Sequence, residues 1–306
     1  MIAVIKDDVR SWDSEVGVEG DSALPGRSAH DEVAWRHLLM EQAVLRGKSV
    51  GELLWDVAKF FDSLDVPLLI QRAEKLDFPI DQLVLGMQVH RAPRVLKADG
   101  CFGEPVEATG VSVLAGCSLS TSLSRAFLRD EVQMSSRERS NGAQATHTVN
   151  QHIDDVSQLV IGDSDSAVVA KCRREGIRLS AAFTRSKLLV STKSVVVASS
   201  KSLAARIAAA LAHDGQPIKA TSAAEDLGVS TACGARRAIG ANKKRLARGL
   251  ARSRRVRILA SANAKATKLH QTGVRPQQSY GASIQGVAPS QIATMRRSAV
   301  LCAAPA

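Results

Sequence analysis

The sequence predicts an α+β fold, in which an antiparallel sheet has helices packed on one face and a mainly helical, basic region follows. Residues 146–162 (THTVNQHIDDVSQLVIG) alternate polar and apolar side chains, reach two adjacent aspartates and then form an apolar run, which is typical of a β-hairpin. Residues 53–57 form a second short apolar strand, and helical patterns lie between the two. This mixed order of strands and helices favours an antiparallel sheet covered by helices.

The first 50 residues are predicted to contain one helix. Residues 11–30 are polar and rich in Gly, Ser and Asp, which indicates a loop or a frayed end. Ser28 and Asp31 resemble a capping box and predict a helix that continues to Gly47. Its residues available for the core are Trp35, Leu38, Leu39 and Leu45.

The central part of the chain alternates short strands with helices. The strand at residues 53–57 carries Asp56, and two strand-like pieces within residues 89–114 are separated by the turn Asp99-Gly100. Further strands are expected around residues 188–199. The helices are expected at residues 66–76, 79–88, about 119–132, 166–176 and 202–215.

Charge is distributed unevenly along the chain. The formal net charge is +11, but the last 80 residues contain 15 Lys and Arg and no Asp or Glu, so residues 1–226 carry −4. A basic region on a mildly acidic body indicates a polyanionic partner. Tyr280 is the one aromatic residue of this region, so we expect it to hold phosphates rather than to stack on bases. A solvated, partly disordered tail or a nuclear-import signal is the alternative.

Several classes of protein are not indicated. The N-terminal apolar run is too short for a signal peptide, and no stretch of about twenty apolar residues could cross a bilayer, so we expect an intracellular protein, nuclear or cytoplasmic, without a membrane partner. The five cysteines form no Cys-x-x-Cys pair, which predicts buried thiols rather than disulfides or a zinc site. His147 and His152 fall on opposite faces of one strand and are not predicted to bind metal.

The adjacent carboxylates Asp154 and Asp155 can be interpreted in two ways. Aspartates are common in turns, so a solvated hairpin tip is the simpler interpretation. Side-by-side carboxylates nevertheless repel unless solvent screens them, one is protonated or a cation joins them. The predicted sheet puts Asp56 on a neighbouring strand, and three carboxylates at one edge would select Mg²⁺ or Mn²⁺.

Five short motifs, one of them in two pieces, resemble the palm of a reverse transcriptase of the non-LTR retrotransposon type. They are WDVAKFFDSLD (55–65), GVSVLAGCSLSTSLSRAFL (110–128), HIDDV (152–156), GIRLS with TKSVV (176–180 and 192–196), and DLGVS (226–230). Each match is short, but the family's order is kept over roughly residues 33–230. The resemblance implies an RNA-directed DNA polymerase that extends a primer 3′-hydroxyl with two metal ions.

The resemblance also implies roles for residues at the reaction centre. Asp56, Asp154 and Asp155 would hold Mg²⁺ or Mn²⁺, and Lys193 would protonate the departing pyrophosphate. Phe61 would exclude a ribose 2′-hydroxyl. The turn at Gly116 and Cys117 would open the helix that lies beneath the template and the incoming nucleotide.

Further residues are implied to contact an RNA template and a DNA primer, with a dNTP as substrate. Leu227 and Gly228 would form the turn of the primer grip. The basic C-terminal region would be the start of a thumb. Its expected contacts to the nucleic-acid backbone are Arg236, Arg237, Lys243, Lys244, Arg245 and Arg248.

Residues 1–50 are then expected to be a loop and helix left from the fingers, residues 51–232 the palm, and residues 233–306 a thumb-like region and tail. The family's basic fingers hairpin has no counterpart before residue 31, so a truncated or inactive copy is also expected. His152, Ala115 and Phe60 depart from the family pattern, in which Tyr, Gln and a small residue are usual.

Two other functions remain open at this point. The first is a non-catalytic remnant that binds nucleic acid through the basic C-terminal region. The second is a metal-dependent nuclease that uses the same carboxylates, although such an enzyme would not require Phe61 or the Leu227-Gly228 turn.

Overall fold

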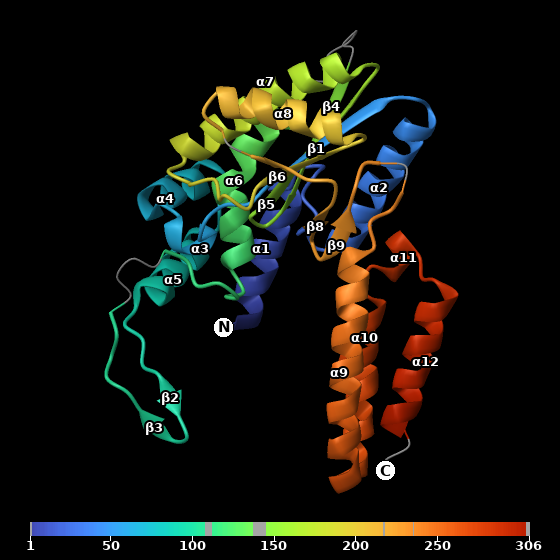
Figure 1. Cartoon of the computed structure of the whole chain (residues 1–306). Coiled ribbons are helices and arrows are strands. Elements are labelled where there is room, and N and C mark those ends of the chain that lie inside the picture. Colours follow the sequence, from blue (N-terminus) through green and yellow to red (C-terminus); the bar gives the residue numbers. More distant parts are fainter. Residues whose placement is uncertain (1, 108–111, 137–144, 217, 235, 304–306) are drawn as a thin grey trace.

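The computed structural model of the chain describes residues 2–107, 112–136, 145–216, 218–234 and 236–303, and it has a central sheet with helices packed against it (Figure 1). The strands are β1 Ser49–Trp55, β2 Lys97–Ala98, β3 Cys101–Phe102, β4 Ala145–His152, β5 Asp155–Gly162, β6 Val195–Ala198, β7 Lys219–Ala220, β8 Ala224–Asp226 and β9 Val229–Thr231. The helices before the C-terminal region are α1 Ile2–Val16, α2 Ala29–Leu45, α3 Phe60–Ser63, α4 Val66–Lys75, α5 Ile80–Arg91, α6 Ser120–Ser136, α7 Asp165–Arg185 and α8 Lys201–His213. The C-terminal helices are α9 Gly240–Ala262, α10 Arg275–Ser279, α11 Ala282–Gln285 and α12 Pro289–Ala303.

The central sheet has the strand order β4-β5-β1-β6-β7. Its neighbouring strands are antiparallel except for β6 and β7, which are parallel. The predicted hairpin is formed by β4 and β5, with His152 opposite Asp155. Strand β1 lies beside β5, with Trp55 opposite Val156. The α+β class and the neighbouring positions of these strands are therefore confirmed.

Helices α6, α7 and α8 pack on one face of this sheet (Figure 1). The large side chains on this face are buried, and the ring of Trp55 meets Phe183 of α7 edge-on at 6.3 Å between centroids. Gly176 of α7 is required by close packing, since a Cβ there would lie 2.8 Å from Leu211 Cδ2 and 3.2 Å from Leu53 Cδ1. The predicted packing of helices on the sheet thus produces the main hydrophobic core.

Helix α2 crosses the opposite face of the sheet, and of its predicted core residues only Leu39 packs against the core. The Ser28 hydroxyl caps it by accepting from the amides of His30 and Asp31, as predicted. Trp35, Leu38 and Leu45, however, are 59%, 56% and 87% exposed. The helix instead buries Val33, Arg36, His37, Met40 and Ala43. The apolar residues of α2 do not mark its buried face, because the sheet face beneath the helix contains Glu52, a carboxylate that requires the Arg36 guanidinium.

The prediction for residues 11–30 is wrong in part, because α1 continues to Val16. The segment after it is fixed to the sheet, where the amide of Gln151 donates to the carbonyl of Gly20 at 2.8 Å. Arg125 of α6 is buried and forms ion pairs with Asp13 and Asp21. Polar residues of this segment therefore form buried ion pairs, and the segment is not a frayed end.

Two further boundaries differ from expectation. The helix expected at residues 166–176 continues to Arg185, and residues 188–199 contain β6 with a preceding loop.

The cysteines are all free, but Cys101 is exposed and Cys117 half-buried, whereas Cys172, Cys233 and Cys302 are buried as expected. Among the described residues, no helix combines the length and apolar character that crossing a membrane requires.

The C-terminal region is helical, as predicted, and is folded through Ala303. Helices α9, α10 and α12 lie side by side and project from the sheet (Figure 1). From the sequence, Ile239, Leu246 and Leu250 are expected on one apolar side of α9, but Ile239 is 42% exposed and Leu246 and Leu250 are only half-buried. The helix packs instead through Val256 and the small or polar residues Ala241, Asn242, Gly249, Ser253 and Ala260. The alternative of a disordered tail is contradicted for residues 236–303.

A second projection comes from the segment between α5 and α6. Strands β2 and β3 pair through the predicted turn, in which Asp99 and Gly100 have φ values of 48° and 83°. This ribbon extends from the sheet in the same general direction as the C-terminal helices (Figure 1). The body of the molecule therefore has two projections.

Candidate functional site

The site is built around the end of the β1–β5 pair. Asp56 follows the last residue of β1, and Asp155 is the first residue of β5. Trp55 lies opposite Val156, so the next step of the same register brings Asp56 opposite Asp155. Residues opposite each other on antiparallel strands have Cβ atoms about 4.5–5.5 Å apart and point to one face of the sheet. Two aspartates far apart in sequence are therefore neighbours.

The strand alternation determines which face these aspartates occupy. Leu53 and Trp55 point toward α7, so Glu52, Leu54 and Asp56 belong to the other face. Helix α2 covers this face around Met40 and Val50. Asp56 remains half-buried and Asp155 is exposed. The end of the sheet that carries Asp56, Asp154 and Asp155, here called the acidic edge, is therefore accessible to solvent.

The turn between β4 and β5 has an unusual backbone. Ile153 has φ of 61°, the left-handed region that a β-branched side chain rarely adopts. Gln151 supports this turn by donating from its side-chain amide to the carbonyl of Ile153 at 2.8 Å. Strained backbone persists where the surrounding structure determines it, and such positions are frequent at functional sites. Here it positions Asp154 at the tip.

The three aspartates interact electrostatically. Burial and the negative charge of Asp56 raise the pKa of Asp154, although its own backbone and His152 act in the opposite direction. The pKa of Asp155 is raised to about 7 by the protein atoms around its carboxyl and by the charges of Asp154, Asp226 and Asp56. The carboxyl of Asp155 therefore lies in an acidic environment. Such an environment attracts cations.

Lys193 lies in a loop bound to the backbone of Asp56. The amide of Ser191 donates to the Asp56 carbonyl at 2.7 Å, and the Asp56 amide donates to Ser194 Oγ at 3.0 Å. Lys193 is exposed between these two serines. The loop therefore brings Lys193 to the same end of the sheet as the aspartates. Residues 176–180, the other piece of this motif, lie inside α7 on the opposite face.

Phe61, Gly116 and Cys117 belong to two segments in backbone contact. Phe61 lies in α3, is half-buried against the core, and its carbonyl accepts from the amide of Val113 at 3.0 Å. Gly116 has φ of 83° in the turn before α6, a conformation that favours glycine. The structure thus brings the first and second motifs together. Part of the second motif, residues 110 and 111, lies outside the described residues.

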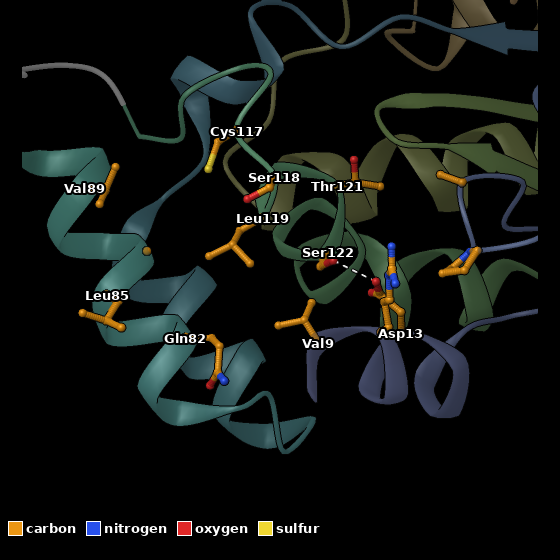
Figure 2. Close-up of a pocket in the computed structure, with 14 residues that line it drawn as sticks. Val9, Asp13, Gln82, Leu85, Val89, Cys117, Ser118, Leu119, Thr121 and Ser122 are labelled. Atoms are coloured by element: carbon orange, nitrogen blue, oxygen red, sulfur yellow. Dashed lines mark hydrogen bonds between the residues drawn. The ribbon is translucent and has the colours of Figure 1, made fainter. Parts of the chain in front are cut away.

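Cys117 lines a cavity of about 650 Å³ between α1, α5 and the start of α6 (Figure 2). Val9, Leu85, Val89 and Leu119 supply apolar walls, and Ser122 donates to Asp13 at 2.9 Å (Figure 2). None of the three aspartates is among the described residues that line it. The cavity is therefore separate from the acidic edge.

Leu227 and Gly228 form the turn of the β8–β9 hairpin, with φ values of 45° and 77°. The Tyr280 hydroxyl donates to the Leu227 carbonyl at 2.9 Å, and Arg245 Nη1 donates to the Gly228 carbonyl. The Arg245 guanidinium also lies over the Tyr280 ring, 4.6 Å from its centroid. The turn is thus held by side chains of the C-terminal helices.

The six basic residues expected to contact nucleic acid divide into two groups. Arg237 is engaged within the molecule, where Nη2 lies 2.8 Å from Glu41 Oε2 and Nη1 donates to the Ile284 carbonyl at 2.8 Å. Arg245 is engaged with Gly228, as described above. The others are exposed, namely Arg236, Lys243, Lys244 and Arg248.

Sequence reasoning missed a buried ionic cluster next to the acidic edge. The Arg36 cluster consists of Arg36 with Glu52 of β1, Asp226 of β8 and Glu32 one turn earlier in α2. Arg36, Glu52 and Asp226 are 2%, 0% and 9% exposed. Burial and Asp226 raise the pKa of Glu52 to about 7 against the effect of Arg36. The one sign of this cluster in the sequence is Glu52, a charged residue within the apolar run GELLW (51–55).

The side chains of the acidic edge are of the type that binds divalent cations, but they are not arranged as a complete metal site. Carboxylate oxygens are hard ligands suited to Mg²⁺ and Mn²⁺. Over the described part of the chain, however, no group of three or more His, Cys, Asp or Glu side chains is arranged so that it could hold a metal ion. Mg²⁺ commonly binds through one or two carboxylates completed by substrate phosphates and water, so a preformed cage of three is not required.

Two solved structures resemble the chain at low sequence identity. Apo telomerase from Candida tropicalis truncated from its C-terminal domain has a TM-score of 0.47 and 12% identity, over 76% of this chain and 43% of that one. Apo telomerase from Candida tropicalis has a TM-score of 0.49 and 11% identity, over 98% of this chain and 54% of that one. The chain spans about half the length of these structures. No protein-family model and no curated protein matches the chain.

Proposed function

We propose that the chain is an RNA-directed DNA polymerase domain of the non-LTR retrotransposon type, which extends a DNA primer on an RNA template with dNTPs. The observation that supports this proposal most directly is the β1–β5 register, in which Asp56 lies opposite Asp155 beside the Asp154 turn. The five motifs give these carboxylates a shared purpose, because nucleotidyl transfer requires cations at the reacting phosphate.

Asp56, Asp154 and Asp155 are proposed to hold Mg²⁺ or Mn²⁺ together with the nucleotide phosphates. The bound cations would activate the primer hydroxyl and neutralise charge on the leaving pyrophosphate. Lys193 is proposed to donate a proton to that leaving group. The attachment of its loop to the Asp56 backbone supports this role, since a general acid must lie within reach of the reacting atoms.

The remaining residues are proposed to position the substrates. Phe61 would exclude a ribose 2′-hydroxyl, and the Gly116-Cys117 turn would lie beneath the template and nucleotide. Leu227 and Gly228 would hold the primer strand, which agrees with their place between the sheet and the C-terminal helices. Arg236, Lys243, Lys244 and Arg248 would contact phosphates.

The experiment is primer extension on an RNA template with Mg²⁺ or Mn²⁺, comparing the wild type with Asp154→Asn. Loss of one metal carboxylate should reduce extension by at least 10²-fold, the scale at which electrostatic stabilisation of a transition state is removed. Asp163→Asn is the matched control, because Asp163 follows β5 at its far end and is an exposed partner of Lys48. Equal extension by wild type and Asp154→Asn would refute the catalytic proposal.

A second candidate is a nucleic-acid-binding protein without catalysis. It is favoured by the finding that no trio of potential ligands among the described residues is arranged to hold a metal ion. In that case wild type and Asp56→Ala should bind a primer–template duplex with equal affinity, and neither should extend it. Steep salt dependence of the binding is expected for both functions.

A further inference from the structure

Arg36 connects three elements that surround the acidic edge. It lies in α2 and forms ion pairs with Glu52 of β1 and Asp226 of β8. Glu52 lies four residues before Asp56 on the same face of the strand. Asp226 directly precedes the Leu227-Gly228 turn. One guanidinium therefore spans from the strand that carries Asp56 to the hairpin that carries the turn.

This connection is selective for an arginine. A guanidinium presents five donors in a planar fork, so it can bond two carboxylates on different elements at once. Both carboxylates and the guanidinium are buried, where each charge depends on its partners. A lysine ammonium on the same helix could not reach both carboxylates with comparable geometry.

The cluster lies within electrostatic range of the proposed reaction centre. The charges of Asp226 and Arg36 both act on the carboxyl of Asp155, in opposite directions. The hairpin is held from its other side by Arg245 and Tyr280, which bond the two turn carbonyls. The turn is thus fixed between the sheet, through Arg36, and the C-terminal helices.

We propose that Arg36 is a positioning residue that holds the Leu227-Gly228 turn at a fixed place beside the aspartates, so that the turn can hold a primer end there. Arg36 itself touches no reacting atom. The inference rests on the proposed function for the primer, but the position of the hairpin can be measured without any activity.

The first measurement is hydrogen exchange of the amides in residues 224–231, in wild type and Asp226→Asn. This variant removes the negative charge through which Asp226 pairs with Arg36, while Glu52 and Glu32 remain as partners, so we expect folding to be retained. We expect exchange in the hairpin to increase at least tenfold while β1 and β5 remain protected. Asp226→Glu should restore most of the protection, because it returns the carboxylate that Arg36 requires.

The second measurement is the KM for primer–template and the KM for dNTP in the same proteins. Loss of positioning should raise the KM for primer–template about tenfold and leave the KM for dNTP within twofold. Asp13→Asn is the matched control, because it removes one of two carboxylates from another buried arginine, Arg125, whose ion pairs with Asp13 and Asp21 involve no residue of the hairpin. It should change neither hairpin exchange nor the primer KM.

Each outcome has a defined meaning. Unchanged hairpin exchange in Asp226→Asn would overturn the positioning role of Arg36. Faster exchange with an unchanged primer KM would overturn the link between the turn and the primer. A wild type that extends no primer would refute the proposed function and with it the primer role, while the exchange data would still decide whether Arg36 fixes the hairpin.

Discussion

At the residue scale, the Arg36 cluster contains one cation and three carboxylates. Arg36 is surrounded by Glu32, Glu52 and Asp226, so full ionisation would leave two uncompensated negative charges in a buried place. Burial, together with the charge of Asp226, raises the pKa values of Glu32 and Glu52. The cluster should therefore tolerate the loss of a carboxylate far better than the loss of the guanidinium.

This asymmetry predicts the pH dependence of stability. A carboxyl whose folded pKa is raised to about 7 favours the folded state fully below its unfolded pKa, and this contribution is lost as pH rises through 7. The loss is about 3 kcal/mol at most. Glu52→Gln should remove this pH dependence and should leave the free energy of unfolding at pH 8 nearly unchanged. Arg36→Met should lower the free energy of unfolding by about 3–5 kcal/mol. Urea unfolding at pH 5 and pH 8 measures both.

Glu175 of α7 is the matched control for Glu52. It is also fully buried, but its pKa is lowered because hydrogen bonds from Arg174 and Lys171 and the charge of His147 outweigh burial. Its stabilising contribution is present above the unfolded pKa and lost as pH falls, so Glu175→Gln should be destabilising at pH 8. Equal effects of the two Gln variants at pH 8 would contradict this account of the Arg36 cluster.

At the element scale, α9 is a helix with a packed face and a basic exposed face. Small residues such as Gly249 bring it close to α10, where a Cβ at Gly249 would lie 2.3 Å from Gln278 Cγ. Lys244 and Arg248 are four residues apart, so they share the exposed face. Arg237, before the helix, is bound to Glu41 of α2 and therefore serves the fold.

The division of basic residues predicts different salt dependences. Lys244→Gln/Arg248→Gln should reduce the slope of log Kd against log salt for duplex DNA by about 2, since each phosphate contact contributes about 0.9. Arg237→Gln should leave this slope unchanged and lower the stability instead. Titrations of labelled duplex at several salt concentrations, together with thermal unfolding, distinguish the two. A slope that falls equally in both variants would assign phosphate contact to Arg237 as well.

At the scale of the whole molecule, the proposed cation site at the acidic edge would couple cation binding to folding. Asp56 and the Asp154-Asp155 pair come from segments about a hundred residues apart, so these carboxylates meet only in the folded chain. A cation that binds this edge binds the folded state alone and stabilises it. In its absence the mutual repulsion of the carboxylates opposes folding.

We therefore expect Mg²⁺ or Mn²⁺ to raise the Tm of the wild type relative to EDTA. A cation at 100 times its Kd contributes about 2.7 kcal/mol. Asp154→Asn should remove most of this gain and, in EDTA, should be at least as stable as the wild type because one repulsive charge is lost. Differential scanning calorimetry in both conditions measures this, with Asp163→Asn as the control that keeps the full gain. An identical cation response in Asp154→Asn would show that the ion binds elsewhere.

Elements whose side-chain patterns are local could be predicted from the residues alone. The hairpin around Asp154, the strand before Asp56 and the capped start of α2 follow from alternation, capping and turn chemistry, and the α+β class follows from their order. The Leu227-Gly228 turn was expected from the resemblance alone. The neighbouring positions of Asp56 and Asp155 could also be predicted, because the motifs resemble a known arrangement of strands. The metal and substrate roles of these residues stay predictions.

Which polar residues are buried follows from long-range packing and could not be predicted from local patterns. Helix α2 turns Arg36 inward and Trp35 outward, and α9 packs through Gly249 and Ser253 rather than through its leucines. Neither choice is visible in a local pattern, because one partner of Arg36, Asp226, lies 190 residues away in the sequence. A buried charge must find its counter-charge wherever the fold brings one, and that long-range requirement overrides the apolar periodicity of a single helix.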